Sequence, residues 1–234
     1  MGDIGMSTAT LTVPPLVAGD RLSRDEFLRR WEAHPEIKKA ELIGGIVYLM
    51  PSPVSIDHGE MDSHVTTWLG VYAAATPGCG TGNNATTFLL EDCAQPDGQL
   101  RLLPEAGGTS WVENKFLHGV PELLAEVSLS STAYDLHQKL DLFREAGVKE
   151  YLAVLLYEQE IRWHYLSRKG YQLLTPDSAG IYRSRIFPGL WLHGKALLGG
   201  NMAKVLATLQ KGMNSDEHVR FVARLNKKLR STRE

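Results

Sequence analysis

The chain has 234 residues, of which 43% are hydrophobic and 22% charged, and its formal net charge is -2. This composition is that of an ordinary globular protein with a sizeable core, and the charge argues against strong non-specific nucleic-acid binding, though not against a local basic patch. The two cysteines are not in CxxC spacing, which excludes that motif for zinc or redox chemistry and favours a reduced, cytoplasmic compartment. The most apolar stretch is too short to cross a bilayer, so we expect no membrane partner.

The first third of the chain predicts a tail, two helices and a hairpin. Residues 1–20 are small, rich in threonine and contain prolines, so we expect a flexible N-terminal tail. Ser23 and Glu26 stand at capping-box spacing before an apolar face, which predicts a helix. Two short apolar runs joined by two glycines are typical of a β-hairpin over residues 40–50. Apolar side chains recur at steps of three and four over residues 56–75, which predicts a longer helix.

The middle of the chain alternates between expected strands and loops. Residues 86–90 form a β-branched, apolar run that predicts a strand, and residues 100–103 are a weaker strand candidate. Residues 78–84 are rich in turn-forming residues, which predicts a turn. Residues 104–119 contain proline, three glycines and few apolar side chains, so we expect a loop there.

The second half of the chain begins with a predicted crossover. An apolar strand at 123–128 is followed by a helix from about residue 134 to 146, which Gly147 is placed to end. A strand at 151–157 comes next, and this order of elements favours two parallel strands. Three further strands are expected at residues 161–166, 171–175 and 182–187.

The remainder of the chain, after Trp191, is expected to be helical. Its last part, residues 216–234, contains six basic and three acidic residues. Such a segment is most often a solvated amphipathic helix, and contacts to phosphate or to a second subunit are the alternatives.

Three acidic residues stand near the ends of predicted strands. Glu126 interrupts the apolar strand at 123–128, and an unpaired buried carboxylate is costly, so it must be neutralised, ion-paired or bound to a cation. Glu41 lies in a similar apolar run, and Asp97 lies just before residues 100–103, where a strand could bring it beside Glu126. Carboxylates in this arrangement suit Mg²⁺ or Mn²⁺, which can promote attack of water on a phosphodiester.

Lys139 lies beside the apolar stripe of its predicted helix, where an outward lysine is not expected. Because this helix follows the Glu126 strand, the lysine could orient the attacking water or stabilise charge on a phosphate. Simpler interpretations stay open. Asp97 could be the turn residue of a Pro-Asp-Gly sequence, Glu126 a buried ion pair, and Lys139 an i,i+4 partner of Asp135. Glu41 could lie on an edge strand that tolerates charge.

Several segments, taken together and in this order, resemble the Uma-type restriction endonucleases of the PD-(D/E)xK nuclease superfamily. The resemblance covers roughly residues 20–195 and rests on residues 40–45, 50–53 with His58 after them, 95–97, 124–128, 135–140 and 146–151. It implies an α/β fold, an α+β mixed sheet of the restriction-endonuclease type with flanking helices, over residues 21–198. Residues 199–234 would be a C-terminal helical extension.

The resemblance also implies roles for individual residues. Asp97 and Glu126 match the two acids that hold the metal, and the carbonyl of Val127 would be a backbone ligand. Ser128 occupies the usual place of the superfamily's lysine, which Lys139 would supply from the following helix. Glu41 matches a further acid, which would be an outer ligand or would position water.

Two further positions concern the comparison with the family, His58 and the residues that follow Asp97. His58 matches a recurrent histidine of open role. Gly98 and Gln99 stand where the family often continues with apolar residues, so the strand after Asp97 is expected to start late.

The expected function is that of a Mg-dependent endonuclease, a hydrolase acting on the phosphodiester bonds of DNA. A homodimer is expected as well, since two symmetric sites can cut both strands. Two alternatives remain from the sequence. One is a catalytically silent domain that binds DNA or a protein partner, and the other is a hydrolase of a different phosphate ester on the same site.

Overall fold

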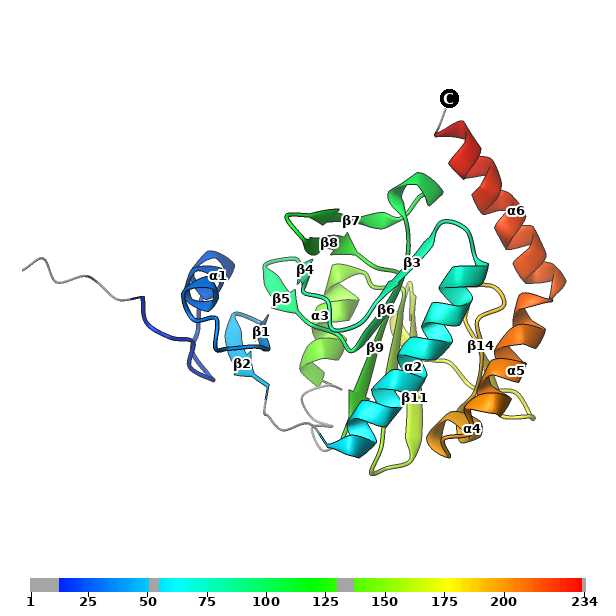
Figure 1. The fold of residues 1–234 in the computed structure, drawn as a ribbon, viewed down its shortest axis with the longest axis horizontal. Coiled ribbons are helices and arrows are strands. Elements are labelled where there is room, and N and C mark those ends of the chain that lie inside the picture. Colours follow the sequence, from blue (N-terminus) through cyan, green and yellow to red (C-terminus); the bar gives the residue numbers. More distant parts are fainter. Residues whose placement is uncertain (1–12, 51–54, 130–136, 233–234) are drawn as a thin grey trace, which may run out of the picture.

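The computed structural model describes residues 13–50, 55–129 and 137–232. It contains two six-stranded mixed sheets and a small third sheet, with helices around them (Figure 1). The helices are α1 (Arg24–Ala33), α2 (Ile56–Ala75), α3 (Lys139–Ala146), α4 (Gly194–Leu198), α5 (Met202–Met213) and α6 (Asp216–Ser231), with a 3-10 turn η1 (Pro104–Ala106). The prediction of a mixed α/β fold with a core sheet and flanking helices is confirmed.

We call the first sheet the N-terminal sheet. Its strand order is β2 (Ile46–Leu49), β1 (Ala40–Ile43), β5 (Asp92–Ala94), β4 (Thr87–Leu89), β8 (Phe116–Val120) and β7 (Thr109–Glu113). The second, the central sheet, has the order β12 (Gly170–Leu173), β11 (Glu160–Ser167), β10 (Glu150–Leu155), β9 (Leu123–Ser128), β6 (Gly98–Leu102) and β3 (Cys79–Gly82). The third pairs β13 (Ile181–Arg183) with β14 (Trp191–His193).

The crossover predicted around α3 is confirmed. β9 and β10 pair in parallel, with Glu126 opposite Ala153, and α3 lies between them in the chain. The helix ends where Gly147 adopts φ 89°, the left-handed conformation that glycine accepts without a steric penalty. The described helix begins at Lys139, and the expected start near residue 134 lies outside the described residues.

The predicted hairpin of β1 and β2 is also confirmed. Gly44 and Gly45 have φ of 60° and 72°, as a two-residue hairpin turn between twisted strands requires. The carboxylate of Asp92, on the neighbouring β5, accepts hydrogen bonds from both glycine N–H groups at 2.7 and 3.2 Å. The turn is therefore fixed by backbone conformation and by a side chain from the adjacent strand.

Several expectations about the middle of the chain are wrong. Residues 104–119 do not form a loop but contain η1, β7 and most of β8. The segment 78–84 contains β3, which gains its hydrogen bonds by pairing with β6. β6 starts at Gly98, directly after Asp97, and not later as expected. β13 stops at Arg183, because the next two residues turn to bond the Glu150 carboxylate.

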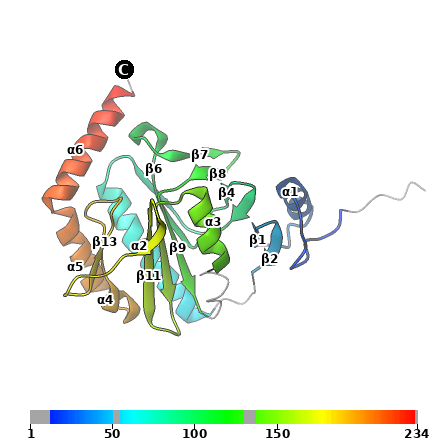
Figure 2. The same cartoon turned by 180° about the vertical axis from the view of Figure 1, so that it is seen from behind.

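Three clusters of buried side chains hold these layers together. The largest packs α2, through Trp68 and Leu69, against one face of the central sheet. A second packs α3, through Phe143, between the opposite face of the central sheet and the N-terminal sheet. Figure 2, seen from behind, shows α3 on that opposite face. The third packs α1, through Phe27, on the outer face of the N-terminal sheet.

The two ends of the described chain both pack on the body of the molecule. Leu16, in the expected N-terminal tail, is buried in the third cluster, and Gly19 donates a backbone hydrogen bond to Val47 of β2. Residues 1–12 lie outside the described residues. The expected C-terminal extension contributes Val205 of α5 and Leu225 of α6 to the largest cluster. None of the described helices is long and apolar enough to cross a membrane.

Candidate functional site

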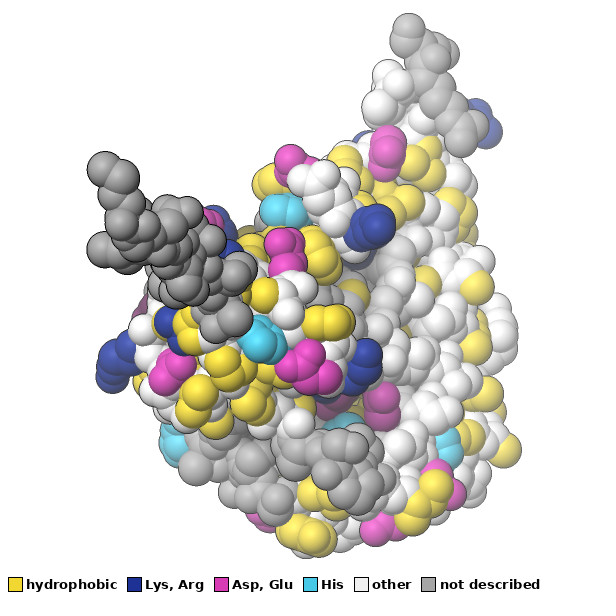
Figure 3. Space-filling model, turned by 60° about the vertical axis from the view of Figure 1, so that its left-hand side comes forward, with side chains coloured by type: hydrophobic (Ala, Val, Ile, Leu, Met, Phe, Trp, Pro, Cys, Tyr) yellow, Lys and Arg dark blue, Asp and Glu magenta, His cyan; other side chains and the backbone are white. Residues whose placement is uncertain are grey.

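The two sheets meet at α3, and the candidate site lies there, near the carboxyl end of β9. Gly98 of β6 pairs with Ala125 of β9, so Asp97 and Glu126 lie next to each other in adjacent strands. Both carboxylates are buried, with 3% and 4% of the residue exposed. Asp97 therefore occupies the position beside Glu126 that the sequence predicted. In Figure 3, acidic, basic and histidine side chains gather in the recess at the centre of one face.

Asp97 is held by one backbone group and approached by two basic side chains. Its Oδ2 accepts a hydrogen bond from the Val127 N–H at 2.9 Å, and the Nε2 atom of His58 lies 3.6 Å from the same oxygen. The Nζ atom of Lys39 lies 3.3 Å from Oδ1. The side chain of Asp97 is thus aimed into the site and does not cap the turn formed by Pro96 and Gly98.

The carbonyl of Val127 points toward the same edge of β9 as its N–H group. Glu122 and Ser128 of the β9 segment accept hydrogen bonds from the β10 segment, at 2.8 and 3.0 Å. Because the direction of backbone groups alternates along a strand, those of Val127 face away from β10. Its N–H group does reach the Asp97 carboxylate. The Val127 carbonyl is therefore directed to the Asp97 side of the strand.

Lys139 joins the acids of two different sheets. Its Nζ atom lies 2.7 Å from Oε1 of Glu126, on the central sheet, and 3.1 Å from Oε1 of Glu41, on the N-terminal sheet. Glu41 Oε1 also accepts a hydrogen bond from the Gln95 N–H at 2.7 Å. All three charged side chains are buried. The interpretation of Glu126 as an acid paired with Lys139 is therefore part of the observed arrangement.

The charges in the site nearly balance. Three carboxylates, those of Asp97, Glu126 and Glu41, face the ammonium groups of Lys39 and Lys139. Among these five described side chains the formal charges sum to one negative charge. A buried excess negative charge attracts a cation or a hydrogen-bond donor, because desolvation of an unbalanced charge is costly.

The donor set fits a hard divalent cation with several water ligands. In the described part of the chain no group of three or more His, Cys, Asp or Glu side chains is arranged to hold a metal ion. A zinc site of four protein ligands is therefore not built from these residues. Mg²⁺ is commonly bound by one or two carboxylates together with water and substrate oxygens. Asp97 and Glu126 supply two such carboxylates, and Val127 supplies a carbonyl oxygen on the Asp97 side of β9.

In the described part of the chain the ammonium groups of Lys39 and Lys139 reach the site, and the sequence predicts only that of Lys139. Lys39 immediately precedes β1, and its side chain is 32% exposed. A signal for it was present, since residues two apart in an extended chain point to one face, which places Lys39 with Glu41. Lys39 also donates to Oδ1 of Asn84 at 2.6 Å, which holds its ammonium over Asp97.

A network behind Asp97 was also not foreseen. Asn83 donates from Nδ2 to the main-chain carbonyl of Asp97 and to Oδ1 of Asp62 of α2, both at 2.8 Å. Burial raises the pKa of Asp62, while the Asn83 hydrogen bond opposes that rise. Asn83 lies in a turn-rich segment, where asparagine is common for local reasons, so no sequence signal marked it.

Three further residues bear on the expected site: His58, Ser128 and Asp135. His58, in the first turn of α2, reaches the site through its contact with Asp97. Ser128 is buried at the end of β9. Asp135, the alternative partner of Lys139, lies outside the described residues.

A mixed sheet flanked by helices, with acids and a lysine at the end of a central strand, is the arrangement of a restriction-endonuclease-like nuclease. The family model of Uma2, described as a putative restriction endonuclease, matches residues 24–195. The chain belongs to this family.

One solved structure supports the fold. It is the crystal structure of a putative nuclease belonging to DUF820 from Anabaena variabilis ATCC 29413, which is 16% identical to the chain. The match has a TM-score of 0.59 and covers 76% of this chain and 98% of that one. No match was found among curated proteins.

Proposed function

We propose that this nuclease-family chain is a divalent-metal-dependent endonuclease that hydrolyses phosphodiester bonds of DNA. One observation carries the proposal. The Lys139 ammonium lies 2.7 Å from Glu126, whose neighbour in the chain, Val127, binds the Asp97 carboxylate through its N–H group. A lysine and two acids thus meet at one strand end, where a cation and a phosphate can be bound together.

Asp97, Glu126 and the Val127 carbonyl would hold the metal, Mg²⁺ or Mn²⁺. A bound divalent ion polarises a phosphoryl oxygen and lowers the pKa of a water molecule near it. Asp97 is fixed by the Val127 N–H, so its second oxygen has a defined direction. This fixed geometry reduces the reorganisation that a reaction requires.

The basic side chains Lys139, Lys39 and His58 have different roles in this proposal. Lys139 would orient the attacking water and stabilise negative charge on the phosphate, since its ammonium is buried and fixed by two carboxylates. Glu41 would position Lys139 and would not need to bind the metal itself. Lys39, which is partly exposed, and His58 would contact the phosphate from the Asp97 side.

The test is cleavage of supercoiled plasmid and of single-stranded DNA with Mg²⁺ or Mn²⁺. Asp97→Asn and Glu126→Gln should abolish cleavage and weaken metal binding measured by calorimetry. Glu150→Gln is the matched control, because Glu150 is also a buried glutamate in the central sheet but bonds the Ser184 loop. This control should cleave like the wild type. Full cleavage by Asp97→Asn would contradict the proposal.

Two other results separate the remaining functions. Metal binding that depends on Asp97, without cleavage of DNA, would indicate another phosphate ester as substrate. Neither cleavage nor metal binding would indicate a silent binding domain. We also propose a homodimer, which light scattering at several protein concentrations tests directly.

A further inference from the structure

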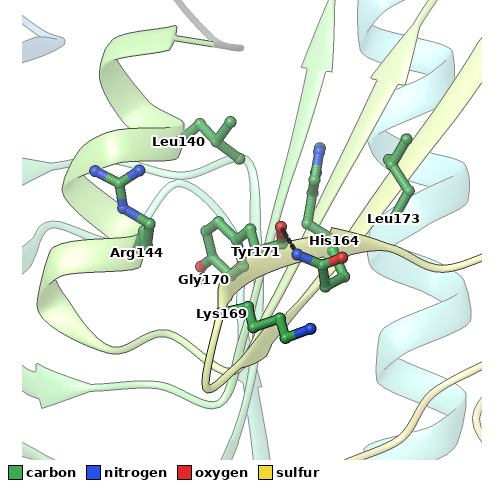
Figure 4. A pocket seen from close by; sticks show the side chains of 8 residues that line it. Leu140, Arg144, His164, Lys169, Gly170, Tyr171 and Leu173 are labelled. Carbon is green, nitrogen blue, oxygen red and sulfur yellow. Dashed lines mark hydrogen bonds between the residues drawn. The ribbon is translucent and has the colours of Figure 1, made fainter.

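A groove lies beside the candidate site, between α3 and the hairpin of β11 and β12 (Figure 4). Its volume is about 610 Å³, within the range of sites that take a molecule of nucleotide size. We propose that this groove binds one nucleotide of the substrate strand, a few nucleotides away from the bond that is cleaved. The inference rests on the proposed function, because it gives the same site a second point of contact with nucleic acid.

The lining of the groove combines apolar walls with cations. Leu140 of α3 and Leu173 of β12 face each other across it, and Tyr171 lies between them. Arg144, on α3, and Lys169, in the turn between β11 and β12, stand on different sides of the groove in Figure 4. None of the described residues that line it carries a carboxylate. Apolar and aromatic surface suits a sugar and base, and two cations suit a phosphate, so the chemistry corresponds to one nucleotide unit.

The aromatic wall is rigid, which favours stacking. The Tyr171 hydroxyl donates to the carbonyl of Val148 at 2.9 Å, so its ring cannot turn freely. His164 stacks on Tyr151 with an interplanar angle of 15°. Burial lowers the pKa of His164, and the nearby Arg162 adds to this effect, so the neutral imidazole is favoured.

The two cations are available to an anion. In the described part of the chain Lys169 forms no salt bridge. Arg144 contacts the carboxylates of Asp141 at 3.0 Å and Glu145 at 3.6 Å, on its own helix. These partners are more than half exposed, and such surface pairs contribute little free energy. A phosphate can therefore replace or share them at small cost.

The position of the groove fits one continuous strand of substrate. Lys139 and Arg144 are on the same helix, five residues apart, which is about 7.5 Å along its axis. His164 lies two strands from β9 in the sheet, about 10 Å away. Each nucleotide advances a strand by about 3.4 Å along a duplex axis, so the groove is within about four nucleotides of Glu126.

The experiment measures binding without requiring cleavage. A fluorescein-labelled single-stranded oligonucleotide is titrated into Glu126→Gln protein in Ca²⁺, with anisotropy recorded at several salt concentrations. In this background Arg144→Gln/Lys169→Gln should weaken binding at least about tenfold. The slope of log affinity against log salt should become less steep by about 1.4, since each phosphate contact with a single strand contributes about 0.7. Lys211→Gln/Arg220→Gln, exposed on α5 and α6 and of equal charge, is the control.

The outcomes distinguish the inference from the proposed function. Cleavage by the wild type, with equal salt slopes for the groove variant and its control, would overturn the groove and leave the nuclease. A slope change confined to the groove variant supports the groove even if no protein cleaves DNA. Photo-crosslinking from 5-iodouracil, placed one to six nucleotides from the 5′ end, gives a second readout that needs no substitution. Crosslinks to residues 169–173 support the groove, and crosslinks only elsewhere contradict it.

Discussion

The side chain of Asp97 accepts a hydrogen bond from the main-chain N–H of Val127 at 2.9 Å, across the gap between β6 and β9. The residue whose carbonyl is a candidate ligand therefore also positions a candidate carboxylate ligand. The two strands set this geometry by their pairing, because Gly98 is opposite Ala125 and the next pair brings Asp97 to Glu126. The site is consequently a product of strand register and not of a local loop.

The first prediction concerns Asp97→Asn. Its amide oxygen can still accept the Val127 hydrogen bond, so the melting temperature should stay within a few degrees of the wild type. The lost negative charge should reduce metal affinity and lower cleavage by about 100-fold or more. Calorimetry with Mn²⁺ and single-turnover cleavage measure these two effects. A large loss of stability with unchanged metal affinity would show that Asp97 is a structural residue.

The second prediction concerns Lys139→Met. This change leaves Glu41 and Glu126 buried without their shared cation, which should cost about 3–5 kcal/mol of unfolding free energy. Adding Glu41→Gln should recover part of that loss, because it removes one uncompensated carboxylate. Urea unfolding of the two single variants and the double variant measures the coupling.

A metal ion should also offset the Lys139→Met change. If Glu126 binds the ion, millimolar Mg²⁺ should raise the urea-unfolding midpoint of the Lys139→Met variant more than that of the wild type. Equal shifts in both proteins would place the ion elsewhere.

The third prediction concerns pH and Glu150. Burial raises the pKa of this carboxyl group from 4.5 to about 6, although Ser184 and the Arg185 N–H donate to it. A raised pKa means that folding favours the protonated form. The stability that Glu150 contributes is therefore fully present below about pH 4.5 and is lost as pH rises through about 6. This change in the free energy of unfolding is about 2 kcal/mol.

Glu150→Gln should remove this pH dependence. Chemical denaturation at pH 4.5, 5.5, 6.5 and 7.5 should show a smaller change for the variant than for the wild type over that range. A wild-type protein whose stability rises steadily from pH 4.5 to 7.5, equally in both proteins, would contradict the assignment.

The fourth prediction concerns Asp92, whose carboxylate accepts from the N–H groups of Gly44 and Gly45. Asp92→Ala leaves both donors without this acceptor and should cost about 2 kcal/mol. Because Glu41 belongs to the same hairpin, cleavage should fall as well, whereas metal affinity, set by Asp97 and Glu126, should change little. Asp92→Asn, which keeps one acceptor, should be intermediate. Equal metal-affinity losses in Asp92→Ala and Asp97→Asn would contradict this division of roles.

The sequence predicts the elements with strong local signals. β9 is an apolar run, interrupted by Glu126, of the type that parallel strands require, and Gly147 marks the end of α3. The crossover can therefore be predicted from the sequence. The β7–β8 hairpin cannot be predicted in this way, because its turn places Asn114 and Lys115 at φ of 48° and 74° without a glycine to signal it. Its strands are also largely exposed and carry no clear alternation.

The candidate site was predicted in part for similar reasons. Glu126 and Lys139 conflict with their apolar surroundings, and such a conflict is visible in one segment of sequence. The contacts of Lys39 and Asn83 with Asp97 join distant segments, and each residue looks ordinary in its own segment. Only the folded arrangement of the two sheets brings them together.

The contacts of Lys139 make the site sensitive to partial opening of the molecule. One of its carboxylates comes from the N-terminal sheet and the other from the central sheet. A fluctuation that separates the sheets would break one of these contacts while every helix and strand stays intact. Such opening requires less free energy than global unfolding. Activity should therefore disappear on heating before the secondary structure does, so the temperature of inactivation reports the closure of the two sheets on α3.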